Sequence, residues 1–203
     1  MTSTKEFSLQ YKSLIDQTAL QKIEEVTNYL KELAISYQIW YHPPLPTIEE
    51  ALKYWEEMPG THCKNLFFRN HKGNRHYLVL FECHQTLDIR SLEQRLKQGK
   101  LTFASQKRMD KYLGVTAGSV TPFGLINDKE QHVKVFIDNQ LKDVSEISFH
   151  PNDNRASLVL ANSDFKKYLE SLGNPVASTG SSSTATRART TSPSAPRPAP
   201  RAG

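Results

Sequence analysis

The chain has 203 residues, of which 37% are hydrophobic, with 26 lysines and arginines against 21 aspartates and glutamates. Four of the arginines lie in residues 176–203, which contain no acid, so residues 1–175 carry 22 basic and 21 acidic residues and a net charge of +1. This balance argues against a broadly basic nucleic-acid-binding face. The chain also contains no apolar run of about 18 residues, so we expect no membrane-spanning segment.

The first part of the chain predicts helices and one short strand. Apolar residues recur at helical spacing in residues 8–16 and 18–35. Residues 36–42 alternate like a strand and are followed by prolines. Thr47 and Glu50 then form a T-x-x-E capping box, which predicts a helix over residues 48–58.

The middle of the chain predicts a β-hairpin. Two apolar runs, residues 63–69 and 75–82, are joined by residues 70–74, which include a glycine. Further elements follow in the order helix, helix, loop, three strands and helix, at residues 87–98, 105–113, 114–124, 132–138, 146–150, 156–161 and 163–173.

The order of these elements predicts one domain of mixed α/β (α+β) class with a mixed central sheet. The hairpin argues against an all-parallel sheet. Residues 1–18 are expected to form an N-terminal helical extension, and residues 19–175 the domain. Residues 176–203 are rich in Ser, Thr, Pro, Ala and Arg, and we expect them to be disordered because they cannot bury enough apolar surface. This composition fits a native tail as well as a fusion remnant.

Lys64, the first candidate site residue, lies in the stretch THCKNLFF, residues 61–68, just before the apolar residues Leu66, Phe67 and Phe68. Lys64, Leu66 and Phe68 share one face of the expected strand, and Asn65 and Phe67 share the other. Periodicity alone favours a strand-end lysine that reaches water. The alternative is a point charge directed at a phosphate or carboxylate.

Two further stretches have the composition of a binding site. The loop GVTAGSVTPFG, residues 114–124, can expose backbone N–H groups to an anion or a carbonyl oxygen, and Gly118 would let a ligand approach. In SFHPNDNRAS, residues 148–157, His150 ends a strand pattern and Pro151 stops it. A plain connecting loop and a turn histidine are the simpler interpretations of these residues.

A metal centre or a cysteine nucleophile is not expected. His62–Cys63 and Cys83–His84 are adjacent pairs, and adjacent strand residues face opposite ways. Their spacing matches no zinc motif. Cys63 borders an apolar run and is expected to act as a small hydrophobic residue. With two cysteines and no apolar leader, we expect a protein of a reducing, cytoplasmic compartment.

Three stretches together resemble the YbaK/prolyl-tRNA synthetase-associated editing family, most of all its free-standing ProXp-ala (PrdX-like) branch. They are KNLFFRNHKGNRHYLVLF (64–81), GVTAGSVTPFGLIND (114–128) and ISFHPNDNRASLVL (147–160). The resemblance covers about residues 20–174. It implies a twisted mixed sheet flanked by helices, and it implies hydrolysis of mischarged alanyl-tRNA(Pro) in trans by a positioned water with help from a substrate ribose hydroxyl.

The resemblance also implies roles for individual residues. Lys64, Asn65, Gly118 and His150 fall on the family's catalytic positions. The expected substrate-binding residues are Ser119, Val120, Thr121, Pro122, Pro151, Asn152 and Asn154. The expected partner is the acceptor end of tRNA(Pro), with prolyl-tRNA synthetase or an elongation factor as a transient partner, and no cofactor or metal. Two alternatives remain open: the same hydrolase acting on Ser, Cys or Thr, and a non-catalytic tRNA- or synthetase-binding module.

Overall fold

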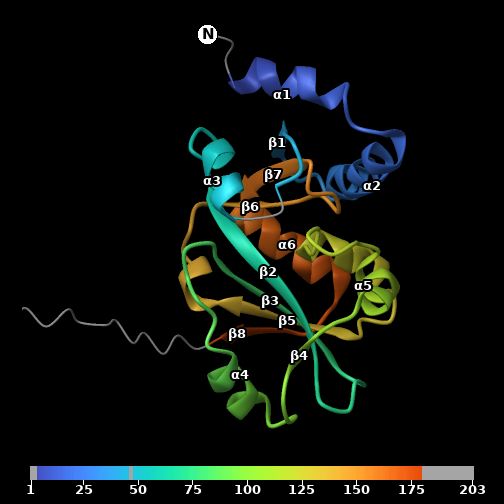
Figure 1. Ribbon diagram of the computed structural model, residues 1–203, viewed down its shortest axis with the longest axis vertical. Coiled ribbons are helices and arrows are strands. Elements are labelled where there is room, and N and C mark those ends of the chain that lie inside the picture. Colours follow the sequence, from blue (N-terminus) through green and yellow to red (C-terminus); the bar gives the residue numbers. More distant parts are fainter. Residues whose placement is uncertain (1–3, 46–47, 180–203) are drawn as a thin grey trace, which may run out of the picture.

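The computed structural model describes residues 4–45 and 48–179, so Thr47 of the expected capping box lies outside the described residues. Figure 1 shows helices packed around a long, bent sheet. The helices are α1 (Thr4–Lys12), α2 (Gln17–Glu32), α3 (Ile48–Trp55), α4 (Ile89–Leu96), α5 (Gln106–Leu113) and α6 (Asn162–Leu172), with 3-10 turns η1 (Pro122–Asn127) and η2 (Asn139–Leu141). The strands are β1 (Tyr37–Tyr41), β2 (Thr61–Arg69), β3 (His76–Glu82), β4 (Thr102–Phe103), β5 (Val133–Asp138), β6 (Glu146–Phe149), β7 (Ala156–Ala161) and β8 (Val176–Thr179).

The strands form one mixed sheet in the order β1-β7-β6-β2-β3-β5-β8, with β4 attached to β2. The β2–β3 hairpin is antiparallel, whereas β2–β6, β3–β5 and β5–β8 are parallel. The predicted α/β class with a mixed central sheet is therefore confirmed. Strand β2 is central because apolar residues on both of its faces pack into the interior, Phe67 in one cluster and Phe68 in another.

The sheet opens along one edge of β2. On that edge β2 pairs with β6 at Thr61 and His62, and with β4 at Phe68 and Arg69. Among the described residues, no strand pairs with residues 63–66 on that edge. Figure 1 shows β2 crossing the molecule, with β6, β7 and β1 beside its start, while β3 runs along most of its length and is followed by β5 and β8. The opening between β6 and β4 is where the candidate site lies.

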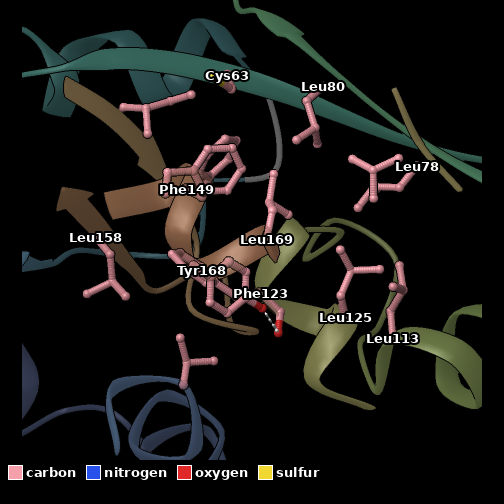
Figure 2. Packing of buried hydrophobic residues seen from close by; sticks show 14 of the residues in the cluster. Cys63, Leu78, Leu80, Leu113, Phe123, Leu125, Phe149, Leu158, Tyr168 and Leu169 are labelled. Atoms are coloured by element: carbon pink, nitrogen blue, oxygen red, sulfur yellow. Dashed lines mark hydrogen bonds between the residues drawn. The ribbon is translucent and has the colours of Figure 1, made fainter. Parts of the chain in front are cut away.

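The main core lies between the sheet and helices α2, α5 and α6 (Figure 2). Tyr168 of α6 is fully buried, and its hydroxyl donates to the carbonyls of Pro122 and Phe123 at 3.2 Å. Its ring meets Phe123 edge-on at 5.2 Å. Burying such a ring contributes roughly 1.5–3 kcal/mol, and its hydrogen bonds hold the end of the 114–124 loop against the core.

Two short strands differ from the sequence-based expectations. Val176–Thr179 were assigned to the tail, but they form β8 and pair in parallel with β5. Arg95 Nη2 donates to the Ser178 carbonyl at 2.9 Å, and Thr179 Oγ1 donates to Asp138 at 2.8 Å. Strand β4 has only two residues, too few for a periodic pattern. The remainder of the expected tail, residues 180–203, lies outside the described residues.

Helix ends agree with the sequence in part. Asp88 caps α4 by accepting the Ser91 N–H at 3.0 Å, and Gly173 ends α6 with a φ of +73°. Ser105 precedes α5 but makes no side-chain cap bond, and α6 begins at Asn162, one residue before the expected range 163–173. Within the described ranges, no helix combines the length and apolarity needed to span a bilayer.

Candidate functional site

A pocket of about 440 Å³ lies at the open edge of β2 and brings the main candidate residues together. It is lined by Lys64 and Asn65 from β2, Gly118 and Val120 from the 114–124 loop, and His150 from the end of β6. These residues come from three separate stretches of the sequence. Its apolar walls are Leu45, Ala51, Trp55, Cys63, Leu66, Phe67, Phe103, Ala104, Met109 and Ala117.

Lys64 and Asn65 are neighbours in a strand and therefore point to opposite faces, yet both line this pocket. This is possible because the pocket meets the edge of β2 and not one face. Lys64 is half-buried, and its Nζ lies 3.4 Å from the carbonyl of Gln85 in the segment after β3. One weak carbonyl contact leaves the ammonium group donors for an anionic ligand.

Asn65 connects β2 to the loop that forms the opposite wall. Its Nδ2 donates to the Val120 carbonyl at 3.0 Å. Its Oδ1 is buried and has no hydrogen-bond partner among the described residues. A buried amide oxygen without a donor carries a free-energy cost of about 1–3 kcal/mol. A ligand with an N–H or O–H group would relieve that cost.

The loop is held in a conformation that exposes backbone at Gly118. The Ser119 N–H donates to the Thr116 carbonyl at 3.1 Å, and Gly118 between them has a φ of +83°. A Cβ on Gly118 would meet only Asn154 Nδ2, at 3.7 Å. The left-handed backbone, and not crowding, therefore favours glycine here.

The side chain of Gln106, in α5, holds the same loop by hydrogen bonds. This residue was not predicted from the sequence. Its Oε1 accepts the Ala117 N–H at 2.9 Å, and its Nε2 donates to the Val115 carbonyl at 3.1 Å. Both ends of one side-chain amide therefore hold the segment just before Gly118. No local pattern marks this residue, because the loop meets α5 only in the folded chain.

The other predicted substrate-binding residues do not line the pocket. Ser119, Thr121, Pro122, Pro151 and Asn152 are buried, and Asn154 is half-buried. Thr121 Oγ1 donates to the His150 carbonyl at 2.6 Å and accepts the Phe123 N–H at 3.3 Å. Thr121 therefore links the 114–124 loop to the backbone of His150. Of the predicted substrate-binding residues, Val120 is the one that reaches the pocket surface.

His150 is held as a neutral imidazole with a defined tautomer. Its Nδ1 lies 2.9 Å from the Ala156 carbonyl, so Nδ1 carries the proton and donates it. Desolvation by the surrounding protein lowers the pKa of His150 below its ordinary value. At neutral pH, Nε2 is therefore an unprotonated acceptor.

Two more histidines lie near His150, His42 buried and His62 half-buried. Burial and the neighbouring His150 lower the pKa of His42 to about 4, and the two rings are 6.0 Å apart. Burial lowers the pKa of His62 to about 4 as well, and its ring stacks on Trp55 of the pocket wall at 4.4 Å. These three histidines therefore stay neutral at neutral pH, and Lys64 supplies the positive charge among the residues that line the pocket.

The cysteines have the properties of hydrophobic residues and not of nucleophiles. Burial raises the pKa of the Cys63 thiol well above its ordinary value and that of Cys83 to about 12. Cys83 does come together with Glu82 and His84, whose ligand atoms all lie within 4.8 Å of one another. These neighbouring side chains can come together because β3 ends at Glu82, so the alternation of strand side chains between two faces does not continue to Cys83 and His84. This triplet is outside the pocket and, among the described residues, is the group that could hold a metal.

Comparison with known proteins places these features in a family. The family model of the aminoacyl-tRNA editing domain matches residues 42–168, which include every candidate site residue. A protein of Acetoanaerobium sticklandii, "Prolyl-tRNA editing protein ProX", is 42% identical over 145 residues, covering 71% of this chain and 88% of that protein. The mouse "Prolyl-tRNA synthetase associated domain-containing protein 1" is 30% identical over 153 residues, covering 73% and 90%.

Solved structures with low sequence identity share the fold. The crystal structure of hypothetical protein APE2540 aligns with a TM-score of 0.59 at 19% identity, over 77% of this chain and 97% of that one. A structure described as a candidate trans-editing enzyme for prolyl-tRNA synthetase aligns with a TM-score of 0.58 at 22% identity, over 81% and 97%.

Proposed function

This chain belongs to the aminoacyl-tRNA editing domain family, and from that premise we propose that it is a trans-acting aminoacyl-tRNA deacylase that hydrolyses alanyl-tRNA(Pro). The observation that carries the proposal is the meeting of Lys64, Asn65, Gly118 and His150 around one pocket. The relative named as a prolyl-tRNA editing protein supports tRNA(Pro) as the RNA.

The proposed reaction is attack of water on the ester that joins the amino acid to the terminal ribose. An aminoacyl ester is already activated, so positioning supplies most of the rate enhancement. As the tetrahedral intermediate forms, negative charge develops on the carbonyl oxygen. The Ala117 and Ser119 N–H groups are already bonded within the protein, whereas the Gly118 N–H makes no hydrogen bond among the described residues and is the donor that would stabilise that oxyanion.

The side chains of the pocket would divide the remaining tasks. Lys64 would bind the phosphate of the terminal nucleotide, because it is the pocket's cation. The free Oδ1 of Asn65 would accept a hydrogen bond from the α-amino group of the amino acid or from a ribose hydroxyl. His150 Nε2 would accept a hydrogen bond from the ribose hydroxyl or the attacking water.

Alanine suits the pocket better than serine or threonine does. Leu45, Phe67 and Met109 of the wall are apolar and would bury a methyl group, whereas a hydroxyl placed against them would lose its hydrogen bonds to water. Discrimination between such small side chains by size alone is limited to roughly 10–200-fold. The preference for alanine over serine should therefore be measurable but not absolute.

The deciding experiment is a panel of tRNA(Pro) samples charged with alanine, serine, cysteine, threonine or proline. We expect fastest ester hydrolysis with alanine and none with proline. Faster release of another amino acid would reassign the substrate and retain the deacylase. RNA binding with every ester intact after long incubation would refute the enzyme and favour a binding module.

A further inference from the structure

An exposed aromatic ring stands at the mouth of the pocket. Phe103 of β4 lines the pocket and is 60% exposed, unlike the other aromatic residues of the pocket. One face of its ring stacks on the buried Phe68 at 4.8 Å with an interplanar angle of 26°. The cross-strand pairs of Phe103 with Phe68 and of Thr102 with Arg69 fix β4 on β2. The ring is therefore held in place with its other face toward solvent.

Two basic stretches of the chain meet beside this ring. Residues 69–75 and 97–108 contain seven lysines and arginines and no aspartate or glutamate. Arg108 Nη1 donates to the Gly73 carbonyl at the hairpin tip at 2.9 Å. Gly99 lies against His71, because a Cβ on Gly99 would be 3.1 Å from the Cβ of His71. The net charge of +1 over residues 1–175 therefore conceals a local concentration of positive charge.

The exposed members of this cluster form what we term the basic rim. Within the described part of the chain, none of them takes part in an ion pair. Their ammonium and guanidinium groups can therefore bind phosphates without first breaking another ion pair. The basic rim consists of Lys72, Arg75, Lys97, Lys100 and Lys107.

The opposite side of the pocket has the opposite charge. Helix α3 contributes Ala51 and Trp55 to the wall, and Glu56 and Glu57 are exposed directly after it. Figure 1 shows α3 at the first end of β2 and the β2–β3 hairpin at the other end. A polyanion that enters the pocket would be repelled by the two glutamates after α3 and attracted by the basic residues of the β2–β3 hairpin.

We propose that the RNA leaves the pocket over Phe103, which stacks on one of the unpaired bases beside the terminal nucleotide, and that its phosphates continue across the basic rim. This path rests on the proposed function. On this path the exposed ring of Phe103 stacks on the face of a base, and every base has such a face. It also explains why a nearly neutral domain could bind an acceptor end strongly enough to act on it.

The experiment uses the full chain and an uncharged RNA hairpin that ends in CCA, with 2-aminopurine at each unpaired position in turn. We expect wild-type protein to quench the fluorescence of at least one position by stacking. Phe103→Ala should abolish that quenching and weaken binding about tenfold or more, whereas Phe103→Trp should retain both. Circular dichroism confirms that each variant is folded.

The basic rim is tested by charge reversal. Lys72→Glu combined with Lys107→Glu should weaken binding and lower the slope of log K against log salt by up to about two. Lys31→Glu reverses an exposed charge on α2 and should change neither the affinity for the hairpin nor the salt slope. Unchanged quenching in Phe103→Ala, or an unchanged slope in the double variant, would overturn the proposed path.

The result is separable from that of the proposed function because the hairpin contains no ester. Stacking by a protein that hydrolyses no aminoacyl-tRNA would uphold the RNA path and refute the deacylase. Hydrolysis of alanyl-tRNA(Pro) with the same KM in wild type and Phe103→Ala would uphold the deacylase and refute the RNA path.

Discussion

The side-chain amide of Asn65 donates to the backbone carbonyl of Val120 at 3.0 Å, which ties the central strand to the loop across the pocket. The two residues are 55 positions apart in the sequence. The bond fixes the amide so that Nδ2 faces the loop and Oδ1 is left without a partner among the described residues. Asn65 therefore supports the pocket wall and keeps one acceptor unpaired beside the pocket.

Replacing Asn65 separates these two tasks. Asn65→Ala should lower kcat/KM for alanyl-tRNA(Pro) by about 10- to 100-fold, because both the loop contact and the acceptor are lost. Asn65→Asp keeps an acceptor but cannot donate to Val120. It should therefore lose loop order as well as activity, seen as faster amide hydrogen exchange in residues 116–121. Full activity in Asn65→Ala would contradict both roles.

Lys64 should matter for RNA binding and turnover more than for folding. Its Nζ makes one long contact, at 3.4 Å to Gln85, and the side chain is half-buried. Lys64→Ala should lower deacylation by at least about 100-fold while the free energy of unfolding changes by less than about 1 kcal/mol. Lys64→Arg should restore part of the activity. A large loss of stability on denaturant titration would instead indicate a structural lysine.

Gly118→Ala tests whether the left-handed backbone of the loop is needed. At a φ of +83°, alanine costs roughly 1–2 kcal/mol, and its Cβ meets no atom closer than 3.7 Å. We expect a modest loss of stability and a loss of activity of tenfold or more as the loop shifts. Gly173→Ala, at a φ of +73° away from the pocket, should lose stability but retain activity.

Buried histidines should make the protein less stable in acid. Burial lowers the pKa of His42 and of His76 to about 4, below the ordinary value of 6.5. Between these values the unfolded chain binds more protons than the folded one, so stability is complete above about pH 6.5 and falls as the pH decreases toward 4. Each histidine contributes up to about 1.4 kcal/mol per pH unit in this window.

Denaturant titrations at pH 7 and pH 5 measure this effect. His42→Gln removes one of the histidines whose pKa is lowered by burial, and it should reduce the dependence of stability on pH. Equal pH dependence in His42→Gln and wild type would show that the folded and unfolded pKa values of His42 do not differ.

Local sequence patterns predicted most regular elements because apolar spacing and chain-breaking residues act over a few positions. The hairpin, strand β7, the start of α4 and the end of α6 follow from such signals. Strands β4 and β8 did not, since β4 has two residues and β8 begins a stretch with tail-like composition. Both are stabilised by pairing with distant strands, β4 with β2 and β8 with β5.

By itself, the sequence determined the mixed α/β class, the position of β2 and the residues that resemble a known family. Only the tertiary structure decided that Lys64 and Asn65, on opposite strand faces, share a pocket with Gly118 and His150. It also showed that Gln106 holds the 114–124 loop and that Phe103 lies at the mouth of the pocket. The reason is that β6 and β4 pair with the two ends of β2 and leave its middle open, and such pairings between distant segments leave no mark in a local pattern.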